Sequence, residues 1–186
     1  MAGLAKNMLI EETPLGGAYL LRIERHTDDR GFFARTWCAH ELEERGLIAR
    51  VTQSNTSFNE SSGTLRGMHF QAPPFSEAKI VRCTKGAIYD VIVDIRANSP
   101  TFRQWFGVEL NDDNRDSLYI PKGFAHGFIT LQDHTEVVYL MSDFYVPSAS
   151  RGFRHDDPAF AIKWPCDALH LSEKDKAWPD FEESSC

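Results

Sequence analysis

The middle of the chain alternates between apolar and polar positions in short runs. Between about residues 50 and 145, runs rich in β-branched and aromatic residues are separated by glycine, proline, asparagine and aspartate. This pattern predicts strands joined by turns. The runs are IARVTQSNTSF, TLRGMHFQ, AKIVRCTKG, AIYDVIVDI, RQWFGVEL, SLYIP, GFAHGFITL and EVVYLMSDFY. Many short strands at this spacing favour a β-sandwich or a barrel.

The run AIYDVIVDI, residues 87–95, shows the alternation most clearly. Every second residue from Tyr89 onward is apolar, so this face is expected to pack on a core. The opposite face carries Asp90 and Asp94 between isoleucines. Because charged side chains are rarely buried, we interpret this mixed face as solvated or as a sheet edge.

The flanks of this region contain the few predicted elements of other kinds. Residues 16–24 are expected to form a strand, and residues 38–46 a helix that ends at Gly46. Near the C-terminus, Ser172 can cap a second helix, with Asp175 three residues on as the acidic member of a capping box.

Length and composition indicate one globular domain. A chain of 186 residues can bury a hydrophobic core without disulfide or metal cross-links. Its contents of 42% hydrophobic and 25% charged residues are ordinary for a globular protein. We divide the domain 1–186 into an N-terminal arm at about 1–50, a core at 51–145 and a C-terminal segment at 146–186.

Charge and cysteine spacing exclude several function classes. A net charge of −7 argues against nucleic-acid binding, although a local basic pocket could still hold a small anion. The four cysteines form no CxxC pair, so neither a zinc site nor a disulfide framework is indicated. No apolar run near the N-terminus is long enough for a signal peptide or a membrane span, so we expect a soluble cytoplasmic protein without a membrane partner.

Two segments have the spacing of cupin motifs, so the strand-rich middle resembles a cupin barrel. The first metal-binding motif of cupins has a glycine, five residues, His-x-His, then a glutamate and, six residues later, a glycine. Here Gly63 is followed at that spacing by His69, and Lys79 is followed by Gly86. The second motif, Pro-x-Gly-x-x-His, stands as PKGFAH and ends at His126.

The spacing is kept but two of the metal ligands are not. Gln71 stands at the position of the second histidine and Lys79 at that of the glutamate. A charged lysine has no lone pair to give, and transition metals prefer imidazole, carboxylate or thiolate. We therefore predict that no catalytic metal is bound, and a metal-dependent cupin, such as a dioxygenase or isomerase, remains an alternative.

A pocket with histidine, lysine and arginine suits proton abstraction next to a carbonyl. A histidine such as His69 can accept the proton, and Lys79 and Arg66 can stabilise the developing enolate oxygen. Epimerisation also requires an acid on the opposite face of the carbon, and the run 136–145 offers Tyr139 and Tyr145. Taken alone, each tyrosine is more typical of a core or rim position.

Several ordered segments give a closer resemblance. They are DDRGFF, GTLRGMHFQ, AKIVRCTKGAIYDVIVDIR, SPTFRQWFGVEL, IPKGFAHGF and DDPAFAIKWP. Together they resemble the dTDP-4-dehydrorhamnose 3,5-epimerase family, over about residues 8–180. The resemblance implies a mainly β, cupin-type jelly roll with a few short helices, a homodimer and no cofactor. It also implies a nucleotide-diphosphate sugar as substrate, with dTDP the expected nucleotide, a 4-keto-6-deoxy sugar, and inversion at C3, at C5 or at both through enolates.

The resemblance also implies catalytic roles. His69 matches the base, Asp175 the carboxylate that orients it, and Tyr139 the acid on the other face. Lys79 and Arg66 match basic residues near the C4 oxygen and the phosphates. Without the resemblance, Asp175 would be interpreted as a helix-terminus acid.

Further positions match substrate contacts. His126 matches a pocket histidine, Gln53 and Asn55 match polar contacts, and Tyr145 completes the substrate-binding set. Arg30 and Phe33 match residues that reach the nucleotide from the partner subunit's arm. Considered singly, His126 would be a hydrogen-bonded buried histidine and Arg30 a member of a weak surface ion pair.

Four positions depart from the usual family pattern. Arg35 and Ser150 stand where glutamates are common, Phe144 where a tyrosine is common, and His155 where a tryptophan is common. These positions belong to regions that shape the substrate pocket. They leave open the nucleotide base and whether one carbon or both are inverted.

Three other functions remain open at this point. The chain could be a C3-only epimerase or a 3,4-ketoisomerase acting on a CDP or GDP sugar, although Gln71 breaks the His-x-His that such ketoisomerases tend to keep. It could also be a sugar-binding module without catalysis, which the joint presence of His69, Tyr139 and Asp175 disfavours.

Overall fold

The computed structural model describes residues 8–183, and most of its regular structure is β-strand. The helices are short: α1 (Ala39–Glu43), α2 (Glu173–Lys176) and the 3₁₀ helix η1 (Pro147–Ala149). The prediction of a mainly β fold with a few short helices is confirmed.

The first sheet has six antiparallel strands. In spatial order they are β1 (Met8–Glu12), β2 (Tyr19–Ile23), β10 (Ser117–Ile120), β7 (Lys79–Lys85), β12 (Thr135–Met141) and β5 (Gln53–Asn59). Apart from β1 and β2, neighbours in this order are far apart in sequence, so the chain crosses repeatedly between layers, as in jelly rolls.

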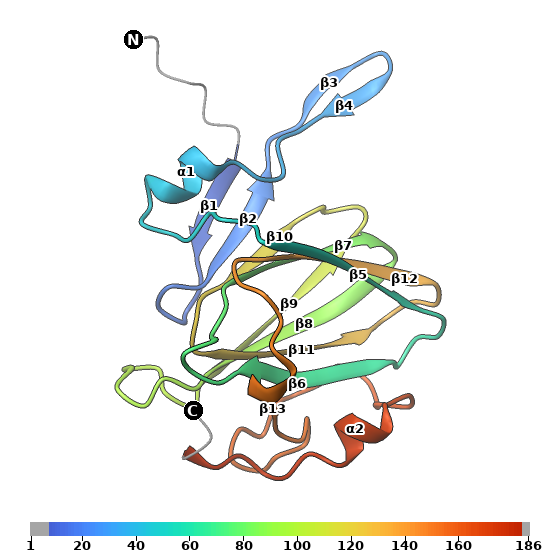
Figure 1. The fold of residues 1–186 in the computed structure, drawn as a ribbon. Helices are drawn as coiled ribbons and strands as arrows, with labels where there is room; N and C mark the ends of the chain where they lie inside the picture. The colour runs from blue at the N-terminus through green and yellow to red at the C-terminus, as the bar shows by residue number, and fades with distance from the viewer. Residues whose placement is uncertain (1–7, 184–186) are drawn as a thin grey trace.

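The second sheet has five antiparallel strands and packs against the first as a sandwich (Figure 1). They are β13 (Ser150–Gly152), β6 (Leu65–Gln71), β11 (Phe124–Thr130), β8 (Ala87–Asp94) and β9 (Trp105–Asn111). A separate hairpin of β3 (His26–Asp28) and β4 (Gly31–Phe33) projects from the sandwich.

Apolar side chains fill the space between the sheets. Val81 from β7 and Leu118 from β10 meet Ile88, Ile92 and Phe128 from the second sheet, and all five are buried. At about 25 cal/mol per Å² of apolar surface removed from water, this burial drives the two sheets together.

The structure corrects the interpretation of strand β8. The alternation is as predicted, but the face with Asp90 and Asp94 points into the sandwich, and both carboxylates are 0% exposed. The wholly apolar face is also covered, because the C-terminal segment packs on it through Phe153 and Phe160. Asp90 and Asp94 each accept a hydrogen bond from a basic side chain, which offsets part of the cost of losing their hydration, although Oδ2 of Asp90 is buried without a hydrogen-bond partner within the described residues.

The predicted helices are present, although both are short. The helix α1 ends at Glu43, earlier than the predicted end at Gly46; the chain turns away at Gly46, which has a φ of 72° and donates to the backbone oxygen of Glu43. In α2 the side chain of Ser172 accepts a hydrogen bond from the backbone of Asp175 at 3.0 Å, so the predicted cap is confirmed. The chain of residues 153–183 brings α2 against β6 (Figure 1).

Candidate functional site

A pocket of about 430 Å³ opens between the two sheets and α2. Strands β5, β6, β7, β11 and β12 and the C-terminal segment all contribute side chains to it. Eight of the residues predicted from the sequence line this pocket: Asn55, Arg66, His69, Lys79, His126, Tyr139, Tyr145 and Asp175. The fold therefore gathers positions that are up to 120 residues apart, since Asn55 and Asp175 both belong to it.

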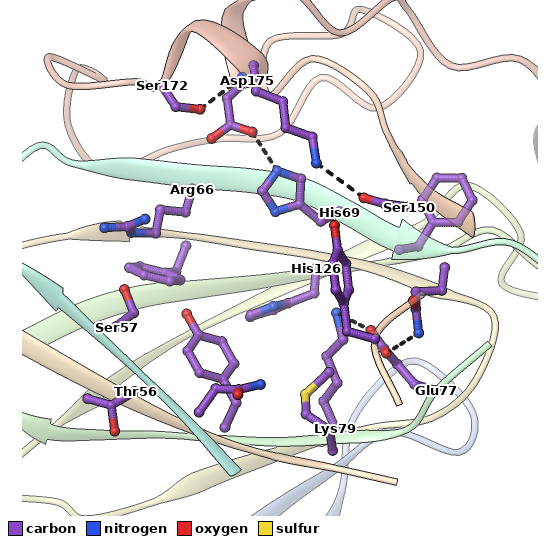
Figure 2. A pocket seen from close by; sticks show the side chains of 18 residues that line it. Thr56, Ser57, Arg66, His69, Glu77, Lys79, His126, Ser150, Ser172 and Asp175 are labelled. Atoms are coloured by element: carbon purple, nitrogen blue, oxygen red, sulfur yellow. Dashed lines mark hydrogen bonds and ion pairs between the residues drawn. The ribbon is translucent and has the colours of Figure 1, made fainter. Parts of the chain in front are cut away.

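The pair His69–Asp175 lies at the α2 side of the pocket (Figure 2). The imidazole Nε2 of His69 is 2.5 Å from Oδ1 of Asp175, whose side chain is only 5% exposed. Burial raises the pKa of Asp175, but the hydrogen bond and charge of His69 outweigh it and leave the pKa below its ordinary value. The ionised carboxylate can only accept, so Nε2 carries the proton and the lone pair of Nδ1 is available as a base.

A second histidine–aspartate pair lies deeper, between β11 and β8. His126 Nε2 is 2.7 Å from Oδ1 of Asp90, and both side chains are buried. The ring of His126 meets that of Tyr139 edge to face, with centroids 6.2 Å apart. The sequence interpretation placed Asp90 at the surface; no local signal predicts its partner, because His126 lies 36 residues further on.

Tyr139 belongs to β12 and enters the same pocket from the opposite sheet to His69. Burial is the main cause that raises the pKa of its phenol, and the nearby charge of Asp90 raises it further, against the opposing effect of Arg66. The phenol is therefore held in its protonated form, as a proton donor must be.

Lys79 opens β7 and is paired rather than free. Its Nζ is 3.0 Å from Oε1 of Glu77, and the two side chains are 11% and 5% exposed. The other oxygen of Glu77 accepts a hydrogen bond from Gln71 Nε2 at 2.5 Å. Glu77 was missed in the sequence because it lies in a turn, where neither periodicity nor a motif marks it.

Arg66 and Lys174 supply further positive charge to the pocket. Arg66 Nε donates a hydrogen bond to the amide oxygen of Asn59 at 2.7 Å, so this hydrogen-bond partner of the guanidinium is uncharged. Lys174, also missed, donates to Ser150 Oγ at 3.2 Å and lies 5.2 Å from the ring of Trp178. Ser150 is one of the four departures from the family pattern, and here it presents a hydroxyl, not a carboxylate, to this lysine.

Three predicted residues do not line the pocket. Gln53 uses its side-chain oxygen to accept from the backbone N–H of Tyr145 at 2.5 Å, so it supports the segment that carries Tyr145. Arg30 and Phe33 lie on the projecting hairpin, where their exposure is high and Arg30 pairs with Asp28. The sequence does not distinguish these three residues from those that line the pocket, because lining depends on where each strand and the hairpin lie in the folded protein.

The other three departures do not line this pocket. Arg35 pairs with the buried carboxylate of Glu41 at 2.5 Å and thereby ties the chain to α1. Phe144 is 69% exposed on the segment after β12. The backbone oxygen of His155 accepts from the indole of Trp164 at 2.9 Å.

The donor set of the pocket does not suit a metal ion. Within residues 8–183, no group of three or more His, Cys, Asp or Glu side chains is arranged to hold one. Over the same range, Cys38, Cys83 and Cys166 are free thiols. No helix in the described part of the chain has the length and apolar character needed to cross a membrane.

Comparisons with known proteins agree on one family. A family profile described as dTDP-4-dehydrorhamnose 3,5-epimerase matches residues 12–183. A dTDP-4-dehydrorhamnose 3,5-epimerase of Methanothermobacter thermautotrophicus is 42% identical over 176 residues, which covers 93% of this chain and 94% of that protein.

Solved structures show the same relationship. A dTDP-4-dehydrorhamnose 3,5-epimerase of Bacillus anthracis, with TDP and pyrophosphate bound, is 42% identical with a TM-score of 0.90, and the match covers 94% of this chain and 99% of that one. A 3′-monoepimerase of Streptomyces bikiniensis in complex with dTDP-quinovose is 30% identical with a TM-score of 0.85, covering 91% and 86% of the two chains.

Proposed function

The chain belongs to the dTDP-4-dehydrorhamnose 3,5-epimerase family, and from this premise we propose how its pocket performs the reaction. The protein is an isomerase that epimerises a nucleotide-linked 4-keto-6-deoxy sugar in deoxysugar biosynthesis. The observation that carries the proposal is one pocket that holds the His69–Asp175 pair together with Tyr139 from the facing sheet.

His69 is the base. Its Nδ1 lone pair takes a proton from the carbon next to the C4 ketone, and the ring becomes an imidazolium. Asp175 stabilises that positive charge and fixes the tautomer through the 2.5 Å contact to Nε2. The electron pair of the broken C–H bond moves to the C4 oxygen, which becomes an enolate.

Lys79 stabilises the enolate. A fixed ammonium close to the C4 oxygen lowers the energy of the anion more than that of the neutral ketone, which is the difference that accelerates proton loss. Arg66, beside a neutral amide, keeps its full charge for an anionic group such as the diphosphate.

Tyr139 returns a proton from the other side. The enolate carbon takes the phenolic proton on the face opposite to His69, so the configuration at that carbon is inverted. The phenolate and imidazolium then exchange protons with water to restore the starting forms, and no redox step is needed. Asn55, His126 and Tyr145 line the remaining wall and contact the sugar nucleotide.

The substrate nucleotide is dTDP, as in the proteins to which the chain is similar. We also propose a homodimer, since Arg30 and Phe33 are exposed on the β3–β4 hairpin outside their own pocket. In a dimer the hairpin of one protomer can reach the nucleotide bound by its partner. Inversion at one carbon or at both is decided by how the sugar turns in the pocket.

The test is proton exchange with solvent. The purified protein is incubated with a dTDP-4-keto-6-deoxyhexose in deuterated water, and NMR locates deuterium at C3 and C5. We expect deuterium at C3, at C5 or at both. His69→Ala should abolish exchange, while Tyr139→Phe should retain initial exchange and lose most net inversion, because the base is intact.

His134→Ala is the matched control. His134 is 63% exposed and pairs with Glu60 on a surface turn, so its loss should leave exchange unchanged. The absence of exchange with dTDP, CDP and GDP forms of the sugar would show that the epimerase proposal is wrong. Loss of exchange only after metal chelation would favour the metal-dependent cupin instead.

A further inference from the structure

Gln71 and Lys79, which occupy two metal-ligand positions of the cupin pattern, are joined through Glu77. Gln71 Nε2 donates to Oε2 of Glu77 at 2.5 Å, and Lys79 Nζ lies 3.0 Å from Oε1 (Figure 2). Gln71 is 5% exposed, and the side chain of Glu77 is also 5% exposed. All three line the pocket, so the chain replaces a metal site with a continuous hydrogen-bonded network.

The same glutamine also holds the segment that follows β12, residues 142–149, which we term the strap. Gln71 Oε1 accepts from the backbone N–H of Val146 at 2.6 Å, and its Nε2 lies 3.2 Å from the carbonyl oxygen of Phe144. Between these two residues stands Tyr145, which lines the pocket although it is 53% exposed. The side chain of Gln71 therefore fixes the backbone on both sides of this tyrosine.

The chemistry of the two side chains suits this double task. An amide offers both a donor and an acceptor, so Gln71 can bind a carboxylate and a backbone N–H at once. A carboxylate has two oxygens, so Glu77 can bind an amide and an ammonium at once. Because both are buried, water competes little for these hydrogen bonds and the geometry is held firmly.

We propose that Gln71 and Glu77 form a positioning unit, in which Glu77 aims the ammonium of Lys79 into the pocket and Gln71 ties that pair to the strap. This inference rests on the proposed function for the roles of Lys79 and Tyr145. Neither Gln71 nor Glu77 exchanges a proton with the substrate. Gln71 acts through the strap on substrate binding, and Glu77 acts through Lys79 on the enolate.

The first test replaces the amide by an apolar group of similar size, Gln71→Leu. Hydrogen–deuterium exchange of the Val146 amide should become about tenfold faster or more, because its acceptor is lost. KM for the dTDP-sugar should rise about tenfold, because Tyr145 loses its fixed position in the pocket. The kcat should fall less than about threefold, because the base His69 keeps its position.

The second test removes the charge and keeps the shape, Glu77→Gln. Gln71 can still donate to the new amide oxygen, so exchange at Val146 should stay at the wild-type rate. The ammonium of Lys79 loses the anion that holds it, so kcat should fall about tenfold with KM within about twofold of wild type. This variant also keeps the proposal testable if Gln71→Leu does not fold.

Gln132→Leu is the matched control, since Gln132 is exposed on the turn before β12 and should change none of these values. Unchanged Val146 exchange in Gln71→Leu, or an unchanged or higher kcat in Glu77→Gln, would overturn the proposal. A lower Tm in both variants, with KM and kcat changed to the same extent in each, would also overturn it, because it would show that the two residues support the fold and do not position Tyr145 and Lys79 separately. If the wild type itself shows no epimerase activity, the proposed function fails, while the exchange rate of Val146 still decides whether Gln71 holds the strap.

Discussion

The base of the proposed reaction depends on a carboxylate that stands 106 residues away from it in sequence. His69 is a strand residue, and Asp175 follows the Ser172 cap at the first turn of α2. The contact gives the imidazole a fixed tautomer, which an isolated histidine in a pocket would not have. At the level of single residues, therefore, the proposed mechanism depends on the hydrogen bond as much as on the histidine.

Asp175→Asn tests this dependence. The amide can no longer stabilise the imidazolium, and it can donate to Nε2 and favour the wrong tautomer. We expect kcat to fall by at least about a hundredfold with the fold intact, a loss in the range of general-base catalysis. Deuterium exchange at C3 and C5 measures the effect, and a kcat within about threefold of wild type would contradict it.

The phenol of Tyr139 provides a second test at this scale. Because burial and the charge of Asp90 raise its pKa above the ordinary 10.0, Tyr139 should remain protonated in the folded protein beyond that pH. The tyrosinate absorbance of wild type and Tyr139→Phe should therefore be the same up to about pH 10. In urea, the wild type should show the tyrosinate absorbance of one more tyrosine near pH 10 than Tyr139→Phe does. If the two folded proteins already differed by that absorbance at pH 10, the expectation would be refuted.

Among the elements, β8 shows how a strand with two charged residues can be almost wholly buried. Asp94 ends this strand and accepts hydrogen bonds from Arg96, Ser99 and Thr101, so it closes the loop towards β9. Burial raises its pKa, but the hydrogen bonds outweigh that cost and hold the pKa below 3.8. The carboxylate therefore stabilises the fold only while it is ionised.

The stability of this loop should depend on pH. Above about pH 4, Asp94→Asn should lower the free energy of unfolding by about 2 kcal/mol, because buried donors lose a charged acceptor. As the pH falls from there through the lowered pKa of the folded state, wild type loses the same contribution and the difference shrinks. Urea unfolding at a series of pH values measures it, with exposed Asp113→Asn as control. A difference that is constant with pH would contradict the assignment.

For the whole molecule, the β3–β4 hairpin is the part that the sandwich alone does not explain. It projects from the body (Figure 1). Arg30, at its turn, has a side chain that is 89% exposed. Phe32 is held between the guanidinium groups of Arg25 and Arg115, at 4.8 and 5.2 Å, so the hairpin has a defined direction. A rigid projecting arm fits the proposed dimer in which each arm completes the partner's site.

Mixing two inactive variants tests this arrangement. If Arg30 acts on the partner's pocket, Arg30→Ala and His69→Ala should each lose most activity, and mixed dimers should regain it. One pocket of such a dimer has both groups intact. His69→Ala mixed with Asp175→Asn is the control without recovery, because both groups belong to the same pocket. No recovery in the first mixture would place Arg30 in its own subunit's site or outside any site.

The sequence by itself determined the strand-rich fold, the Ser172 cap and eight of the residues that line the pocket. Period-two alternation and turn residues are local properties, so they can be seen without a structure. The resemblance to the family then predicted eleven site residues, and eight of them line one cavity.

Only the tertiary structure decided which charges are buried and which residues act together. Asp90 looked like a surface residue because its partner His126 belongs to another strand. Glu77 showed no signal because its burial, and the way its two oxygens bind Gln71 and Lys79, depend on how the loop between β6 and β7 is packed in the folded protein. Burial and pairing are properties of contacts between distant segments, so local pattern indicates which residues are available and the packing of the two sheets decides what each one does.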